Sequence, residues 1–339
     1  MNYEMNTRIA TIMAVHRERY ELYAEEGIFY GRLKTVNFYN TRDIVDFPTV
    51  GDEVRVDFNE NGDSQIIEIL PRKTVFMRLN ATQGLPDQAV AANFDYVFIT
   101  MSLNRDFHIS KLERYLAVSW QSGAIPVIIL TKADLCEDRD FYLSQVSQIA
   151  SGVDVYCVSS VTGEGFFDLA PYFKKRKTVV LLGSSGVGKS SFVNALLGRT
   201  EMLTGRIREA DAQGRHTTTY KQCIILPEEI KLPNGESISG GGHIIDTPGM
   251  RKLIVSDIGE GREKSFEDIE KLIACCRFSD CQHKTEPGCA VRAALESGEL
   301  NPKQWKTYLN LQKEEAYAKE RRKVMEKRME KSYRNKLRR

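Results

Sequence analysis

Apolar and polar residues alternate near the start of the chain, as they do in strands with one buried face. Valine and phenylalanine alternate with charged residues over 53–58, and Asn61-Gly62 supplies a tight turn before the apolar run 66–69. Two earlier apolar runs supply further short strands. Residues 1–72 are therefore predicted to form an OB-type β-barrel, with an SH3-like barrel as the alternative. Such a barrel either binds oligonucleotides or serves as a packing module.

The pattern changes between residues 73 and 255. Short apolar runs without alternation are separated by stretches long enough for helices, which is typical of a mainly parallel sheet in an α/β domain. The expected strands are 95–100, 127–130, 153–158, 178–182 and 244–246. Sheets of this kind bind ligands at the carboxyl ends of their strands. The motifs that follow these strands are therefore the candidates for a functional site.

The segment Gly183–Ser190 reads Gly-Ser-Ser-Gly-Val-Gly-Lys-Ser and lies between the strand 178–182 and an expected helix over 190–197. This is the sequence and the setting of a P-loop, whose glycines let backbone N–H groups face phosphate oxygens. Lys189 is expected to bridge the β- and γ-phosphates and so to contribute to catalysis, and the Ser190 hydroxyl to bind Mg²⁺. The expected phosphate-binding residues are Gly183, Ser184, Ser185, Gly186, Val187, Gly188, Lys189, Ser190 and Ser191.

Two further motifs follow strand ends. In Asp-Thr-Pro-Gly at 246–249, Asp246 would complete the Mg²⁺ shell and the Gly249 N–H would sense the γ-phosphate. In Thr-Lys-Ala-Asp at 131–134, the Asp134 carboxylate would accept hydrogen bonds from the N1 and N2 groups of guanine. Each tetrapeptide alone is a common turn. Together with the P-loop they predict a guanine-nucleotide site.

Four more residues contribute to the expected base pocket. Ser159 and Ser160 follow another strand and would offer backbone donors to the base, while the stem of Lys132 would lie along it. Thr131 opens the base motif at the position where the usual GTPase motif has asparagine. The amide of that asparagine ties the base loop to the phosphate loop.

The order of the motifs is unusual. The base motif at 131–134 precedes the P-loop at 183–190, whereas Ras-like GTPases place it well after. Residues 73–255 are therefore predicted to form a circularly permuted Ras-like P-loop GTPase domain. Permutation keeps the pocket intact in space but changes which element leads out of it. Here the γ-phosphate sensor leads directly into the C-terminal domain, residues 256–339.

A cluster of metal ligands lies in that domain. Cys276, Cys281, His283 and Cys289 offer three thiolates and one imidazole, which fill a tetrahedral Zn²⁺ site and leave no open position. One structural Zn²⁺ is therefore expected, and its binding would help to fold a region with little apolar core. Cys275 is an alternative ligand to Cys276, and reduced cysteines without metal are the alternative for the whole cluster. Seven cysteines, an odd number, suit a reducing cytoplasm better than a disulfide framework.

The end of the chain is basic. Asn301-Pro302 is a good helix start, and Trp305, Tyr308 and Leu309 form an apolar stripe that should dock the first turns. The 29 residues after position 310 hold 12 Lys/Arg against 5 Asp/Glu, a formal charge of +7, which leaves −5 for the rest of the chain. Such a segment suits contacts with the phosphates of nucleic acid, although a solvated charged helix is the plain alternative. No apolar run is long enough to span a membrane.

With its 339 residues, the chain resembles the small-ribosomal-subunit-dependent GTPase A family over nearly its whole length. The resemblance rests on the motif order, on Gly-Arg-His-Thr-Thr-Thr at 214–219, on Met250-Arg251 after the 246–249 motif and on the cysteine cluster. It implies a monomeric cytoplasmic factor that uses GTP with Mg²⁺. It also implies binding to the small ribosomal subunit and its rRNA, a role in late maturation, and release coupled to hydrolysis.

The resemblance also implies two roles in hydrolysis. Met250 stands where Ras-like enzymes have the glutamine that orients the attacking water, and a thioether cannot do this. The family pattern gives that role to His216, while Thr218 would close on Mg²⁺. A loop histidine that packs or contacts RNA is the alternative for His216.

Two rival functions stay open on the sequence. One is a nucleotide-gated RNA-binding scaffold in which hydrolysis is incidental. The other is a P-loop kinase or ATPase, against which Asp134 predicts a preference for guanine.

Overall fold

The structure is a computed structural model. It describes residues 6–16, 19–25, 27–34, 47–78, 87–104, 107–198, 222–246 and 259–337. The chain forms two compact units. The first comprises Met1–Phe107, Gly123–Arg139 and Val153–Leu253, and the second comprises His108–Ser122, Asp140–Gly152 and Ile254–Arg339.

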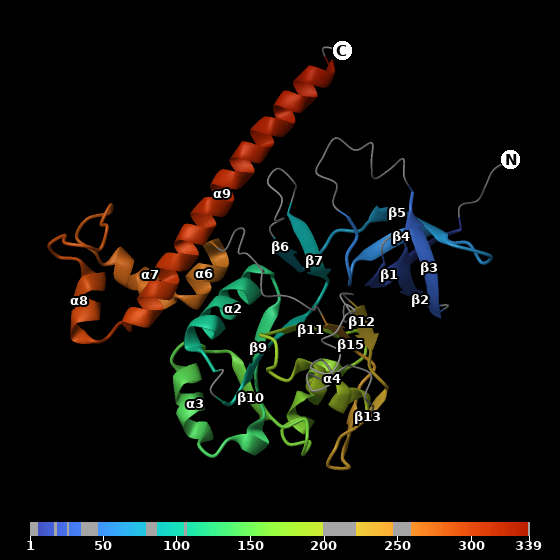
Figure 1. Cartoon of the computed structure of the whole chain (residues 1–339), viewed down its shortest axis with the longest axis horizontal. Coiled ribbons are helices and arrows are strands. Elements are labelled where there is room, and N and C mark those ends of the chain that lie inside the picture. Colours follow the sequence, from blue (N-terminus) through green and yellow to red (C-terminus); the bar gives the residue numbers. More distant parts are fainter. Residues whose placement is uncertain are drawn as a thin grey trace, which may run out of the picture. The chain divides into compact units, whose positions relative to one another are not determined.

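A closed five-stranded barrel begins the first unit (Figure 1). Its strands are β1 (Thr7–Val15), β2 (Tyr20–Ala24), β3 (Gly27–Leu33), β4 (Glu53–Asp57) and β5 (Ser64–Ile69). They are ordered β1-β2-β3-β5-β4, and pairing of β1 with β4 closes the ring. The β3–β5 pair is parallel and the others are antiparallel. This Greek-key order confirms the OB-type barrel and excludes the SH3-like alternative.

The barrel core follows from the alternation in the sequence. Side chains two residues apart on one strand point to the same face, and Val54 and Val56 of β4 are fully buried. They join a cluster with residues from the other strands: Ala10, Ile12, Tyr20, Leu22 and Ile66. Phe58 lies just beyond β4, where the Phe29 ring meets it edge to face at 5.1 Å.

A buried ion pair fixes the segment that leads into β4. Both carboxylate oxygens of Asp52 accept from Arg72, at 2.6 and 2.7 Å, and Asp52 is fully buried. Gly51 has a φ of +87°, and a Cβ there would lie 2.0 Å from the Ala92 carbonyl oxygen. Only glycine fits this approach. Ala92 ends β7 (Gln88–Ala92), which pairs with β6 (Val75–Arg78).

The sheet of the first unit contains every strand expected in residues 73–255. Its strands are β8 (Tyr96–Ser102), β9 (Ile125–Thr131), β10 (Asp154–Val158), β11 (Thr178–Leu182), β12 (Gln222–Ile225) and β15 (His243–Asp246). Their order is β10-β9-β8-β11-β15-β12, and only β12 among them runs antiparallel to its neighbour. Barrel strand β1 continues the sheet by pairing with β12, with Ala14 opposite Gln222. The mainly parallel α/β sheet is confirmed.

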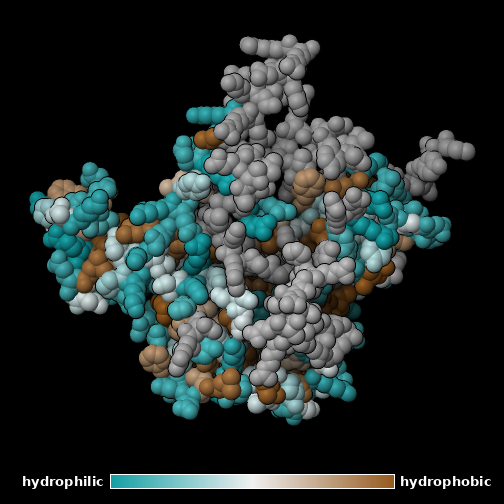
Figure 2. All heavy atoms as spheres, in the orientation of Figure 1, coloured by the Kyte–Doolittle hydropathy of each residue, from teal (hydrophilic) through white to brown (hydrophobic). Residues whose placement is uncertain are grey.

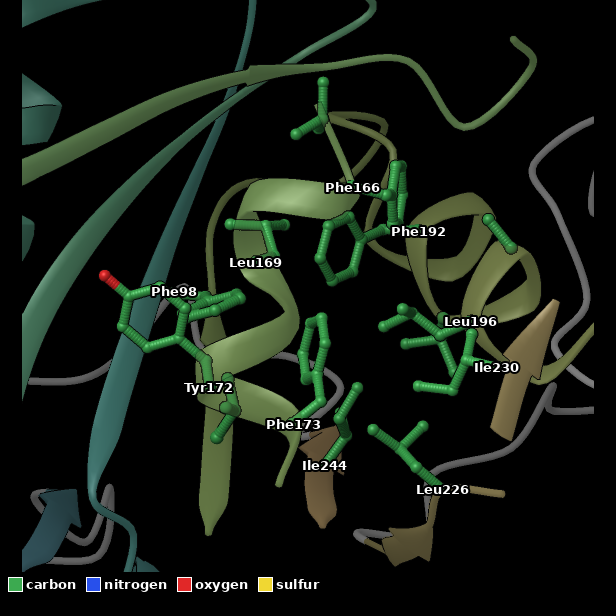
Figure 3. Close-up of a cluster of buried hydrophobic side chains, with 14 of the residues drawn as sticks. Phe98, Phe166, Leu169, Tyr172, Phe173, Phe192, Leu196, Leu226, Ile230 and Ile244 are labelled. Atoms are coloured by element: carbon green, nitrogen blue, oxygen red, sulfur yellow. The ribbon is translucent and has the colours of Figure 1, made fainter. Parts of the chain in front are cut away.

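Aromatic packing fixes the helix that follows the P-loop. Helix α4 (Lys189–Leu197) and the 3₁₀ segment η2 (Phe167–Phe173) bury most of their apolar side chains on one face of the sheet. Phe166, Phe173, Phe192 and Phe98 converge there (Figure 3), and the rings of Phe166 and Phe192 stack at 4.9 Å. Each fully buried ring contributes roughly 1.5–3 kcal/mol. The short hairpin β13 (Glu229–Lys231) and β14 (Ser237–Ser239) adds Ile230 and Ile238 to this cluster.

The second unit is helical. Its helices are α2 (Ile109–Gln121), α3 (Arg139–Ser147), α6 (Gly259–Ser265), α7 (Glu267–Ala274), α8 (Ala290–Ser297) and α9 (Pro302–Leu337). Helix α6 packs closely on α2, because a Cβ at Gly261 would lie 2.3 Å from the Ala117 carbonyl oxygen. Helix α2 and most of α3 thus belong to a unit with the C-terminal helices. The domain boundaries expected at residues 72 and 255 stay predictions.

Helix α9 begins at Pro302, as expected, and the Asn301 side chain caps it by accepting from the Lys303 N–H at 2.9 Å. Among the side chains of this helix that the structure describes, the buried ones are Tyr308, Leu311, Glu315 and Ala318, so the docked stripe differs from the expected one. The helix spans 36 residues, about 54 Å, and its C-terminal half extends beyond α6 and α7 (Figure 1).

The surface is mainly polar on the face drawn in Figure 2, where hydrophobic residues form small separate patches. In the described part of the chain, no helix is both long and apolar enough to cross a membrane.

Candidate functional site

The P-loop lies between β11 and α4, where the sequence places it. Gly186 and Gly188 have φ values of +82° and +101°, a region that side chains rarely adopt. A Cβ at Gly183 would lie 2.3 Å from the Thr100 hydroxyl oxygen, so the loop also needs glycine there. The Lys189 ammonium donates to the Gly183 and Ser184 carbonyl oxygens, each at 2.7 Å. The loop thus curls around its own lysine at the N-terminus of α4, where unpaired N–H groups and the helix dipole favour anions.

Two side chains of the base motif contact the P-loop directly. The Thr131 hydroxyl donates to the Val187 carbonyl oxygen at 2.5 Å, and it also lies 3.2 Å from the Met101 carbonyl oxygen. The Lys132 ammonium donates to the Gly186 carbonyl oxygen at 3.0 Å. Thr131 is 2% exposed. Threonine therefore supplies a tie between base loop and phosphate loop at the position where the usual motif has asparagine.

Asp134 is placed to face solvent beside that contact. It lies in the short 3₁₀ turn η1 (Ala133–Leu135), which Lys132 enters with a φ of +62°. Asp134 is exposed, which agrees with the role toward guanine that is predicted for it. Arg139 holds the turn from outside by donating to the Ala133 carbonyl oxygen at 2.9 Å.

The loop after β10 is closed on itself. Ser159 is fully buried, and its hydroxyl oxygen accepts from the Val161 and Thr162 N–H groups at 3.2 and 3.1 Å. Gly163 has a φ of +81°, and a Cβ there would lie 2.9 Å from the Asn234 backbone nitrogen at the tip of the β13–β14 hairpin. Ser160 is half-buried within this rigid turn. The structure therefore supplies a preformed loop at the position expected to line the base.

Asp246 ends β15, where it is opposite Leu181 of β11 and 8% exposed. It therefore lies one strand away from the start of the P-loop. Ser190 and Ser191 open α4 and are half-buried. The predicted residues His216, Thr218 and Gly249 lie outside the described residues. Their roles, like the nucleotide and Mg²⁺ roles given to the described residues, stay predictions.

The metal-ligand cluster is compact. The ligand atoms of Cys276, Cys281, His283 and Cys289 lie within 4.8 Å of one another. The Cys276 and Cys289 sulfurs are 4.0 Å apart, and His283 Nδ1 lies 3.6 and 3.5 Å from them. Tetrahedral zinc with its usual bond lengths would place two sulfurs about 3.8 Å apart and a sulfur and a nitrogen about 3.5 Å apart. The four residues therefore fit a metal ion of this kind.

Local structure holds these ligands in place. Cys276 follows α7, and Cys289 is the N-cap of α8, where its sulfur accepts from the Arg292 N–H at 3.4 Å. The Trp305 ring of α9 meets the His283 ring edge to face at 5.5 Å. The Glu286 carboxyl accepts from its own backbone N–H and from those of residues 284, 285 and 282, and these hydrogen bonds lower its pKa to about 2. This carboxylate shapes the loop that carries His283.

Sequence reasoning missed Arg139, Glu164 and Asn234. Arg139 pairs with Glu164 across 25 residues, and Asn234 meets Gly163 from a different hairpin. None of the three belongs to a nucleotide-binding motif. Arg139 and Glu164 lie in or next to the two loops in sequence, but only the folded chain brings the partners of these contacts together, so no local signal in the sequence marks the contacts.

A P-loop on a parallel sheet, tied to a base motif that precedes it in the chain, defines a circularly permuted P-loop GTPase. The model of the RsgA GTPase family matches residues 69–256. The chain belongs to this family and is a GTPase.

Relatives and solved structures agree with this assignment. The chain is 47% identical over 306 residues to "Small ribosomal subunit biogenesis GTPase RsgA 1" of Listeria monocytogenes, covering 90% of this chain and 83% of that one. It is 41% identical to "RsgA 2" of Vibrio parahaemolyticus, covering 92% and 80%. The crystal structure of YjeQ from Thermotoga maritima matches with a TM-score of 0.63 at 25% identity over 91% of this chain and 99% of that one. YloQ, described as a circularly permuted GTPase, matches with a TM-score of 0.58 at 25% identity over 93% and 97%.

Proposed function

We propose that this GTPase is an assembly factor that binds the small ribosomal subunit through its rRNA and acts late in the maturation of that subunit. The names of the relatives support the process, since they describe small ribosomal subunit biogenesis. The contacts of Thr131 and Lys132 with the P-loop carbonyls carry the nucleotide-binding part, because they unite the base motif with the phosphate motif in one site. The factor acts as a monomer in the cytoplasm.

In the proposed site, each residue has a defined task toward GTP. Asp134 accepts from guanine, the Lys132 stem lies along the base, and the loop of Ser159 and Ser160 offers backbone donors. Lys189 exchanges its bonds to the Gly183 and Ser184 carbonyls for phosphate oxygens, because a charged partner gives a stronger hydrogen bond.

Mg²⁺ supplies charge neutralisation at the phosphates when it is bound. The oxygen ligands would come from Ser190, Asp246 and Thr218, and the Gly249 N–H would bond the γ-phosphate. His216 would orient the water whose oxygen attacks the γ-phosphorus. The bond from that phosphorus to the β,γ-bridging oxygen breaks, and GDP leaves.

Release is coupled to this step through the chain itself. Asp246 ends β15, and α6 begins at Gly259, so the segment that contains the γ-phosphate sensor leads into the second unit. Helix α6 in turn packs on α2 through Gly261. Loss of the γ-phosphate would be transmitted along this connection to the contacts that α6 makes, and the second unit would then release the particle.

Two surfaces suit rRNA. The basic half of α9 offers lysine and arginine along about 27 Å of helix, which is enough to contact several phosphates without reading bases. The OB-type barrel adds a module that elsewhere binds oligonucleotides. Zn²⁺ at the cluster of Cys276, Cys281, His283 and Cys289 would stabilise the segment between α7 and α8, which precedes α9 in the chain.

The test is turnover of GTP and ATP with and without purified small subunits. Wild type should hydrolyse GTP slowly alone, on the order of 10⁻⁴ to 10⁻³ per second as in Ras, and faster with subunits. His216→Ala should lose the stimulated rate, whereas His108→Ala, an exposed histidine that is not among the proposed site residues, should keep it. A His216→Ala protein that still completes subunit maturation would support a scaffold in which hydrolysis is incidental. Equal use of ATP would contradict guanine recognition.

A further inference from the structure

One arginine connects the two loops that meet the guanine base. Arg139 is the first residue of α3, and its two terminal nitrogens donate to the two carboxylate oxygens of Glu164, at 2.5 and 3.0 Å. The nitrogen that makes the longer of these bonds also donates to the Ala133 carbonyl oxygen at 2.9 Å. A single guanidinium therefore joins the turn of Asp134 to the loop of Ser159.

The position of this contact matters because strand pairing ends just before it. The β9–β10 register runs from Val127 opposite Asp154 to Thr131 opposite Val158. Beyond that pair, the backbone hydrogen bonds shown for the two described loops stay within each loop, such as Ser159 N–H to the Glu164 carbonyl. The side-chain bridge from Arg139 continues the link where the backbone ladder stops.

Charge gives the bridge a second effect. Hydrogen bonds from Arg139 lower the pKa of the Glu164 carboxyl, and the nearby Asp134 charge acts in the opposite direction. The two carboxylates are therefore close enough to repel each other. Arg139 offsets this repulsion, which solvent already screens in part because both carboxylates are exposed.

We propose that Arg139 is a positioning residue for guanine specificity, which sets the place of Asp134 relative to the Ser159 loop. This inference rests on the proposed function, in which Asp134 reads the N1 and N2 groups of guanine. Hypoxanthine has the same shape and N1 group but lacks the N2 amino group. The ratio of the dissociation constants for IDP and GDP therefore measures how well Asp134 is placed, independently of the phosphate contacts.

The experiment measures binding of GDP and IDP to the full chain. Wild type should prefer GDP by tenfold or more, because a hydrogen bond to a charged group is lost with IDP. Arg139→Ala should reduce that preference about tenfold. Arg139→Lys should fall between the two, because an ammonium group cannot offer the same planar fork. The control is Arg55→Ala, which breaks the exposed Arg55–Glu68 pair of the barrel at 2.6 Å and should keep the wild-type preference.

The outcomes separate the two ideas. A wild type that binds GDP and IDP equally would contradict the role of Asp134 and so the proposed function. A wild type that prefers GDP, together with an equally selective Arg139→Ala, would overturn the positioning role alone. If Arg139→Ala does not fold, Arg139→Lys and Glu164→Gln decide the question. Reduced preference in both would support the role, and wild-type preference in both would overturn it.

Discussion

Replacement of Thr131 by valine tests whether the base motif and the phosphate loop act as one site. Valine has nearly the same shape as threonine, so the change removes the hydroxyl with little change in packing. In the wild type that hydroxyl donates to the Val187 carbonyl oxygen, and Thr131 is 2% exposed. In the variant, water has little access to replace the lost donor.

The magnitude follows from the carbonyl that is left behind. A buried polar group without a partner costs about 1–3 kcal/mol. Val187 belongs to the loop that must keep its curved shape around the phosphates, so this cost should appear as weaker nucleotide binding. At about 1.4 kcal/mol for each factor of ten, GDP affinity should fall roughly 5- to 150-fold. Part of the cost would instead lower the stability of the fold, so the lower half of this range is the firmer expectation.

The assay is the equilibrium dissociation constant for GDP, measured together with the free energy of unfolding in urea. Thr49→Val is the matched control, because Thr49 is 3% exposed and its hydroxyl donates to the Val90 carbonyl oxygen at 3.1 Å, at the barrel end of the unit. Both variants should lose similar stability, but only Thr131→Val should bind GDP more weakly. Wild-type affinity in Thr131→Val would refute the reasoning that this hydroxyl shapes the P-loop.

Three other expectations concern the rest of the molecule. Burial raises the pKa of Glu113 to about 7, against 4.5 for an ordinary glutamate, although the nearby Thr307 hydroxyl partly opposes the rise. Between these pH values Glu113 ionises in the unfolded chain but not in the folded one, so the stability of wild type falls as pH rises. Glu113→Gln should therefore be more stable than wild type by up to about 3 kcal/mol at pH 8 and nearly equal to it at pH 4. Urea unfolding at the two pH values measures the difference. Arg72→Met leaves Asp52 buried without its counter-charge, and its free energy of unfolding should fall by about 3–5 kcal/mol. Cys289→Ser should lower the zinc content below that of wild type and speed amide hydrogen exchange across α8, and unchanged zinc content would contradict the ligand set.

The fold follows closely from patterns that reflect local physics. Alternation over 53–58 places Val54 and Val56 in the barrel core, and the run 178–182 becomes a fully paired parallel strand. The apolar stripe of α9 was harder to predict. Trp305 and Leu309 are only half-buried, whereas Glu315 is buried because it pairs with Arg262 and Lys319. Lys319 lies on α9 itself, but Arg262 comes from α6, and periodicity along one helix does not reveal a partner on another.

Some features of the candidate site could also be predicted from the sequence, and others could not. The sequence motif predicts that Thr131 and Lys132 line the base pocket. In the structure their side chains donate hydrogen bonds to carbonyl oxygens of the P-loop. The sequence does not indicate that threonine can make the tie of asparagine, because this depends on how closely β9 approaches the loop. The bridge between Arg139 and Glu164 is equally hidden, since neither residue belongs to a motif.

Because of the permutation, a short stretch of chain joins the Ser159 loop, which is expected to line the base, to the P-loop. In this chain the Ser159 loop runs into η2, which leads to β11 and so to the P-loop. Two rings anchor that connection to the core, because Phe166 and Phe173 are fully buried and Phe166 stacks on Phe192 of α4 (Figure 3). These rings hold the segment before β11 against the helix that carries Lys189, since packed cores resist gradual deformation. The chain path and the aromatic stack together fix the Ser159 loop relative to the P-loop more firmly than a fully exposed linker would.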